Sequence, residues 1–108
     1  MKRGDVITIS SSGDYGKPRP AVVIQSDRLT TQDSVLVVLL TSHISDSPLF
    51  RLTILPNAAN GLKFSSQIMI DKILAFPRIK CGAVIGKIDK NNLNSLNRLL
   101  SVMIGLAD

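Results

Sequence analysis

The residues "SVLVVLLTS" (34–42) contain the longest apolar run of the chain. The run itself is only six residues, 35–40, so it is far too short to cross a bilayer, which takes about 20 apolar residues in a helix. A short apolar run bounded by polar residues predicts a strand that is covered on both faces. The rest of the chain must therefore supply a packing layer on each side of this strand.

Further strands are predicted on both sides of this run, because short segments rich in β-branched residues are separated by turn-forming loops. These segments are "DVITIS" (5–10), "RPAVVIQ" (19–25), "LFRLTIL" (49–55), "SQIMIDKILAF" (66–76) and "CGAVIGKI" (81–88). Asn60-Gly61 is a turn signal within one of the loops. Pro20 stands near the start of its strand, where a missing N–H is tolerated.

The period of the apolar residues changes after Asp89, which is a suitable N-cap for a helix. One apolar face combines residues spaced by three and four positions: Leu93, Leu96, Leu100 and Met103. Short strands followed by one amphipathic helix predict a mainly β fold with a C-terminal α-helix. We expect a strongly curved antiparallel sheet or small barrel with the helix packed on it, as a single domain over 1–108.

The charge balance points to an anionic partner. Thirteen Lys and Arg face eight acidic residues, a net charge of +5, which suits a nucleic acid, an acidic protein or a membrane surface. With no Trp and only Tyr15, Phe50, Phe64 and Phe76, a base-stacking platform built from several aromatics is not expected. The single Cys81 fits a reducing cytoplasm, where we expect a small buried hydrophobe.

The familiar enzyme signatures are absent. With one His and one Cys the chain cannot build a Cys/His zinc site, and we expect neither a metal nor a cofactor. Catalysis must then rest on Arg, Lys, Ser, Thr, Asp71 or His43. Thr41 and Ser42 end the long apolar strand, where side chains have rigid support, although such a pair is also an ordinary strand end.

Arg19 is the sharper candidate, since it stands between Pro18 and Pro20 in "KPRPAVVIQSD" (17–27). The prolines restrict the backbone to extended geometry, which lowers the entropy lost when the side chain meets a ligand. Its guanidinium fork matches a phosphate, and Lys17 adds a second cation nearby. The alternative is an arginine whose stem covers the edge of the core while its charge stays in water.

Four segments in this order resemble the MazF/PemK-type toxins of bacterial toxin–antitoxin systems, and the resemblance covers nearly the whole chain. They are "MKRGDVITIS", "KPRPAVVIQSD", "VLVVLLTSH" and "SSQIMIDKI". The resemblance implies an SH3-like or CcdB-like barrel that forms a homodimer. It further implies a location in the bacterial cytoplasm and no membrane partner. It also implies a sequence-specific, metal-independent endoribonuclease that cleaves single-stranded RNA, inhibits translation and growth, and is held inactive by an acidic antitoxin.

Site residues follow from the resemblance by position. The catalytic pair of the family falls on Arg19 and Thr41, and Gln67 with its neighbour Ser66 matches the RNA-binding positions. We add Lys17 and Ser42 as RNA contacts, and the loop 11–17 is expected to border the substrate groove. Since RNA carries its own nucleophile, the 2′-OH, we expect a 2′,3′-cyclic phosphate or a 3′-phosphate and a 5′-OH as products.

One departure and two alternatives stand beside this interpretation. Relatives often carry Arg-Thr-Ile-Asp-Lys in the segment where this chain has Met69-Ile70-Asp71-Lys72, so its RNA specificity is expected to differ. One alternative is a CcdB-like gyrase poison, but its Trp-Gly-Ile ending is missing here. The other is a non-catalytic module that binds RNA or an acidic peptide.

Overall fold

The computed structural model describes residues 1–10, 17–46 and 50–108. The order of elements is β1 (Asp5–Ile9), β2 (Arg19–Val23), β3 (Ser34–Thr41), β4 (Arg51–Ile54), β5 (Ser66–Pro77), the 3-10 turn η2 (Arg78–Lys80), β6 (Cys81–Lys87) and α1 (Lys90–Met103). Every predicted strand and the helix are present, with ends shifted by at most a few residues. Most of the predicted groove-bordering loop, residues 11–16, lies outside the described residues.

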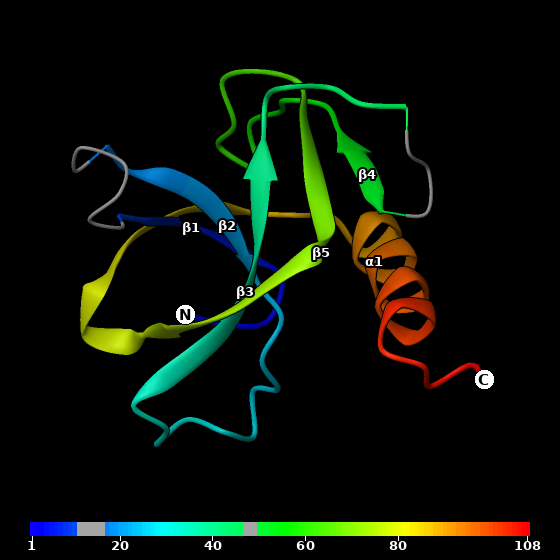
Figure 1. The fold of residues 1–108 in the computed structure, drawn as a ribbon. Coiled ribbons are helices and arrows are strands. Elements are labelled where there is room, and N and C mark those ends of the chain that lie inside the picture. The colour runs from blue at the N-terminus through cyan, green and yellow to red at the C-terminus, as the bar shows by residue number, and fades with distance from the viewer. Residues whose placement is uncertain (11–16, 47–49) are drawn as a thin grey trace.

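The strands form one strongly curved antiparallel sheet in the order β4-β5-β3-β2-β1-β6, against which α1 packs (Figure 1). The mainly β fold class with a C-terminal helix is therefore confirmed. The strand containing the long apolar run, β3, lies inside the sheet between β2 and β5. The edge strand β6 is also reached by the β4–β5 connection, since the backbone N–H of Lys87 donates to the carbonyl of Ala59 at 2.9 Å.

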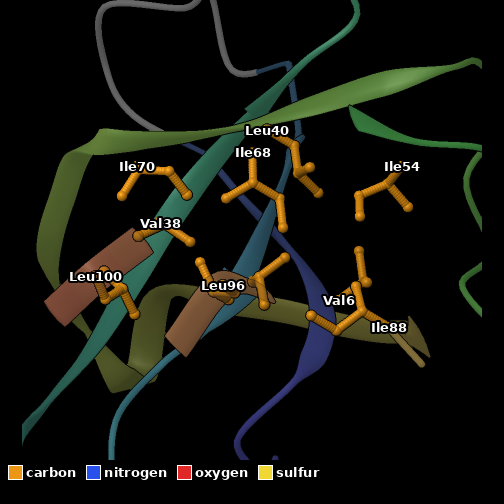
Figure 2. Close-up of a cluster of buried hydrophobic side chains, with 10 residues drawn as sticks. Val6, Val38, Leu40, Ile54, Ile68, Ile70, Ile88, Leu96 and Leu100 are labelled. Atoms are coloured by element: carbon orange, nitrogen blue, oxygen red, sulfur yellow. The ribbon is translucent and has the colours of Figure 1, made fainter. Parts of the chain in front are cut away.

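The larger core lies between the sheet and α1, where aliphatic side chains from five strands meet two leucines of the helix (Figure 2). The helical leucines are Leu96 and Leu100, and Leu93 and Met103 pack against the same cluster as predicted. Asp89 caps the helix, because its carboxylate accepts a hydrogen bond from the N–H of Asn92 at 2.7 Å. Capping satisfies a donor that the first turn leaves without an intrahelical partner.

A second core lies on the opposite face of β1, β2 and β3. Within β3, Val38 and Leu40 belong to the first core, whereas Val35 and Val37 belong to the second. The prediction that both faces of this strand are covered is thus confirmed for most of its length. Leu36 is the exception, with 41% of its surface exposed.

The ladder between β3 and β5 contains a large irregularity. Val38 pairs with Ile73, but two residues further along β3 Leu40 pairs with Ile68, so several residues of β5 have no partner on β3. β5 bends at this point (Figure 1), and its first half also pairs with β4 through residues 66–69. This bend carries the start of β5 to the end of β3, where the functional candidates gather.

Candidate active site

A pocket of about 530 Å³ opens where the start of β2, the end of β3 and the start of β5 meet. Arg19, Thr41, Ser42 and Ser66, four residues singled out in the sequence, all line it. The volume falls within the range of about 300–1,000 Å³ that is usual for small-ligand sites. Candidates predicted from distant parts of the sequence therefore line the same pocket.

The antiparallel register brings Arg19 and Thr41 together. Ala21 of β2 pairs with Leu39 of β3, so the residues two positions beyond, Arg19 and Thr41, lie at the same end of the two strands. Because side chains alternate along a strand, positions two apart keep the same face. Arg19 is exposed and Thr41 is half-buried. The guanidinium of Arg19 and the hydroxyl of Thr41 therefore line one pocket from neighbouring strands.

The Thr41 hydroxyl is held by the backbone that follows it. Its Oγ1 accepts a hydrogen bond from the N–H of His43 at 3.1 Å, which turns the chain sharply after β3. A hydroxyl that accepts one hydrogen bond still has its own hydrogen to donate. Thr41 can therefore present a donor to a ligand oxygen in the pocket at a fixed orientation.

Gln67 pairs directly with Thr41 in the ladder, but its side chain is directed elsewhere. Gln67 is 4% exposed. Its carboxamide forms two hydrogen bonds with the backbone of Ser45: Nε2 donates to the carbonyl and Oε1 accepts from the N–H, each at 2.9 Å. Nε2 also lies 3.2 Å from the hydroxyl of Thr53. The side chain thereby fixes the segment that follows Thr41, and its contact with RNA stays a prediction.

Comparison with known proteins decides the family. The model of the family described as PemK-like, MazF-like toxin of type II toxin–antitoxin system matches residues 2–104. The chain belongs to this family. A protein named probable endoribonuclease MazF, from Mycolicibacterium smegmatis, is 40% identical over 108 residues, which cover 99% of each chain. The predicted family and the predicted enzyme class, an endoribonuclease, agree with both findings.

Solved structures show the same fold at lower identity. An endoribonuclease in complex with its cognate antitoxin, from a mycobacterial species, has a TM-score of 0.82 and 20% identity, covering 98% of this chain and 96% of that one. A MazE–MazF structure from Deinococcus radiodurans has a TM-score of 0.80 and 17% identity, covering 97% and 95%. The MazF-like fold of this chain is thereby confirmed.

Part of the pocket was not foreseen from the sequence. Lys63 and Phe64, from the loop between β4 and β5, line the wall together with Leu62 and with Ile85 of β6. The one signal was a cation followed by an aromatic just after the Asn60-Gly61 turn, too short a pattern to indicate a site. Lys63 adds a second cation to Arg19, and the described lining residues include no carboxylate. Lys17 is exposed just before β2 and is not among them.

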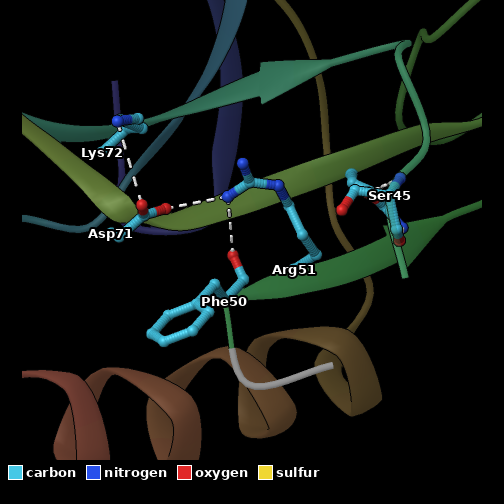
Figure 3. Close-up of polar contacts among 6 residues, drawn as sticks. Ser45, Phe50, Arg51, Asp71 and Lys72 are labelled. Atoms are coloured by element: carbon cyan, nitrogen blue, oxygen red, sulfur yellow. Dashed lines mark hydrogen bonds and ion pairs between the residues drawn. The ribbon is translucent and has the colours of Figure 1, made fainter. Parts of the chain in front are cut away.

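Asp71 and His43, the two other candidates, are not among the described residues that line the pocket. Asp71 forms an ion pair with Arg51 across β4 and β5 at 2.8 Å, with Lys72 on its other side at 3.9 Å (Figure 3). Burial raises the pKa of Asp71, but the hydrogen bonds from Arg51 and from the backbone, together with the charges of Arg51 and Lys72, outweigh it and hold the pKa below its ordinary value. His43 is exposed, as its position at a strand end predicted.

Cys81 is half-buried against the second core rather than fully buried, because it begins an edge strand. Burial raises the pKa of its thiol, so the thiol is protonated at neutral pH and packs as a small hydrophobe.

The described residues contain no cluster of three or more His, Cys, Asp or Glu side chains that could hold a metal ion. The described part of the chain also holds no helix with the length and hydropathy of a membrane span.

Proposed function

We propose that this family member is a metal-independent, sequence-specific endoribonuclease that cleaves single-stranded RNA, with Arg19 and Thr41 as its catalytic pair. The observation that carries the proposal is their meeting in one pocket with a second cation, Lys63. A phosphodiester needs positive charge and hydrogen-bond donors around its non-bridging oxygens, and this lining supplies both. Family membership and the 40% identical relative, named as a probable endoribonuclease, support the same reaction class.

The reaction takes its nucleophile from the substrate. The 2′-oxygen attacks the adjacent phosphorus, the bond from phosphorus to the 5′-oxygen breaks, and the proton of the 2′-OH is lost while the leaving 5′-oxygen gains one. The products are a 2′,3′-cyclic phosphate, which water can open to a 3′-phosphate, and a 5′-OH. DNA lacks the 2′-OH and is not a substrate for this route.

Arg19 and Thr41 divide the work by their chemistry. The guanidinium of Arg19 stays protonated in proteins, so it cannot act as the base and instead stabilises the negative charge that grows on the phosphate oxygens. The Thr41 hydroxyl donates a hydrogen bond to a phosphate oxygen or to the leaving oxygen. Because neither group is a strong acid or base near neutral pH, most of the acceleration comes from positioning and charge stabilisation.

The remaining predicted site residues bind the strand. Ser42 and Ser66 line the pocket beside the catalytic pair, and Lys17 precedes Arg19 on the exposed approach to β2. The positive charge of Lys17 adds salt-dependent affinity for the RNA backbone. Gln67, whose carboxamide also holds the backbone at Ser45, contributes to RNA binding with its neighbour Ser66 in this proposal.

Two protein partners belong to the proposal. Relatives of this fold have been crystallised with a cognate antitoxin, and the net charge of +5 suits an acidic antitoxin segment that covers the pocket. We infer that a homodimer would use exposed apolar positions of β5 such as Leu74, which is 40% exposed. We place the protein in the bacterial cytoplasm as a single toxin domain over 1–108. Sedimentation of the purified chain as a monomer at micromolar concentration would contradict the dimer.

A pair of matched RNAs tests the reaction. One carries ribose throughout and the other a single 2′-deoxy sugar at the cut site, and both are incubated in EDTA. We expect cleavage of the all-ribose RNA alone, with 5′-OH ends that polynucleotide kinase labels without prior phosphatase treatment. Equal cleavage of both RNAs, or abolition by EDTA, would refute the internal-nucleophile route.

A further inference from the structure

Phe64 is an exposed aromatic on the wall of the candidate active site. Sixty-eight per cent of its surface is exposed, although a phenyl ring stabilises a fold only when it is buried. Among the described lining residues it is the only aromatic, and it shares the pocket with Arg19 and Thr41. Its ring is therefore available to a ligand that occupies the pocket.

The loop that presents Phe64 is rigidly built. The Asn60 side chain is 1% exposed, and its carboxamide accepts hydrogen bonds from the N–H groups of Asn57 and Leu62 and donates to the carbonyl of Leu55. Gly61 has a φ of +69° and packs so closely on the backbone of Ile85 that a Cβ would not fit. The loop is thus fixed against β6 before it reaches Phe64.

Ser66 completes the support. Its hydroxyl donates to the carbonyl of Phe64 at 2.9 Å, and its side chain is buried. A ring held on a rigid loop loses little conformational entropy when a ligand binds. Besides any contact with RNA, Ser66 therefore holds the backbone of Phe64, two residues before it.

The pocket combines the two chemistries of a nucleotide. Arg19 and Lys63 suit a phosphate, while Phe64, Leu62 and Ile85 form an apolar wall that suits the flat face of a base. An acidic peptide would match the cations but has no need of a free aromatic face beside them. We propose that Phe64 stacks on one base of the bound RNA, next to the phosphate that Arg19 contacts. This inference rests on the proposed endoribonuclease function.

Binding to an uncleavable RNA tests the stacking directly. The probe is a short RNA around a cut site mapped by its 5′-OH ends, blocked by a 2′-deoxy sugar at the cut. We expect Phe64→Ala to weaken its affinity by about tenfold or more, as loss of an aromatic stacking partner does, and Phe64→Trp to retain it. Phe50→Ala is the matched control, because Phe50 is also an exposed phenylalanine, at 44%, but does not line the pocket; we expect less than a twofold change.

Fluorescence gives a second readout of the same contact. The chain has no Trp, so Phe64→Trp introduces a single indole, and stacking on a base should quench its emission when the RNA is added. The corresponding Phe50→Trp variant should keep its emission. Replacing one nucleotide at a time by an abasic sugar should locate the base that stacks on Phe64. At that position the abasic sugar should lower the affinity of the wild-type protein for the RNA, but it should not lower the affinity of Phe64→Ala any further.

The outcomes separate this inference from the proposed function. Wild-type affinity in Phe64→Ala, together with normal cleavage by wild type, overturns the stacking and leaves the endoribonuclease intact. RNA binding that depends on Phe64 without cleavage of the all-ribose RNA overturns the proposed function instead. Loss of binding to an acidic antitoxin peptide, with RNA affinity unchanged, also overturns the stacking and assigns Phe64 to the protein partner.

Discussion

Two hollows of similar size lie at opposite ends of the β3–β5 pair. The candidate active site, about 530 Å³, lies at the end of β3 and the start of β5. The other, about 430 Å³, lies at the start of β3 and the end of β5 and is called the far hollow here; it is lined by residues 30–34 and 77–79. Each contains one arginine and at least one threonine, so neither size nor these two residue types distinguish them.

Their construction does distinguish them. The far hollow has a carboxylate, Asp33, in its lining, and Arg78 is tied to its rim, because its Nε donates to the carbonyl of Gln32 at 2.9 Å. The active-site pocket instead draws one cation, Arg19, from β2 and a second cation and an aromatic, Lys63 and Phe64, from the β4–β5 loop, and no described carboxylate lines it. A site for an anion is therefore indicated by the convergence of charge from distant segments rather than by volume.

Arginine substitutions should show the largest difference between the two hollows. We expect Arg19→Ala to slow RNA cleavage by about 10³-fold or more, since it removes the charge that stabilises the transition state. Arg78→Ala, the matched change in the far hollow, should leave the rate within about twofold. Initial rates on one RNA measure both, with circular dichroism melting to confirm folding. Equal losses in the two variants would remove the distinction between the hollows.

Threonine substitutions should follow with a smaller effect. Thr41→Ala removes one hydroxyl donor, and we expect about a 10²- to 10³-fold loss in the rate of cleavage. Thr41→Ser keeps the hydroxyl and the hydrogen bond to the N–H of His43, so it should recover most of the rate. Thr31→Ala, in the far hollow, serves as the control. A Thr41→Ser variant as slow as Thr41→Ala would contradict the role of the hydroxyl.

Glutamine substitutions compare the buried side chain of Gln67, which is hydrogen-bonded to Ser45, with the exposed side chain of Gln32. Gln67→Leu leaves the N–H and carbonyl of Ser45 without their partners, so we expect the free energy of unfolding to fall by about 1–3 kcal/mol in urea titrations. Gln32→Leu should change it by less than about 0.5 kcal/mol, because Gln32 is exposed and holds Arg78 through its backbone carbonyl. If Gln67→Leu is as stable as wild type, the hydrogen bonds between Gln67 and Ser45 do not stabilise the fold.

The smallest effect is expected at the Arg51–Asp71 ion pair, which borders neither hollow. The folded-state pKa of Asp71 is lowered, so its stabilisation is present above the unfolded pKa of about 3.9 and is lost as the pH falls through the folded value. Asp71→Asn should therefore destabilise by less than about 1 kcal/mol at pH 7 and by less at pH 2 than at pH 7, with cleavage unchanged. Urea titrations at both pH values measure the difference. A stability gap that does not narrow between pH 7 and pH 2, or slower cleavage, would contradict this account.

The strands and the helix were predictable because they depend on local patterns. The β-branched segments, the Asn60-Gly61 turn and the Asp89 cap each express a preference of neighbouring residues, and the structure confirms them. The sequence by itself also marked Arg19 between its prolines, and the order of motifs identified the family. Cys81 was expected to be buried, but it is half-buried, because its place on an edge strand depends on the sheet order.

Tertiary structure alone decided how these residues meet. The irregularity in β5 and the antiparallel register bring Ser66 and Thr41 to Arg19, and the packing of Gly61 on β6 brings Lys63 and Phe64 to the same wall. It also turned the Gln67 carboxamide toward the backbone of Ser45. Such contacts join segments that are tens of residues apart, and no local preference specifies them. The sequence determined which chemistry is available, and long-range packing determined where it converges.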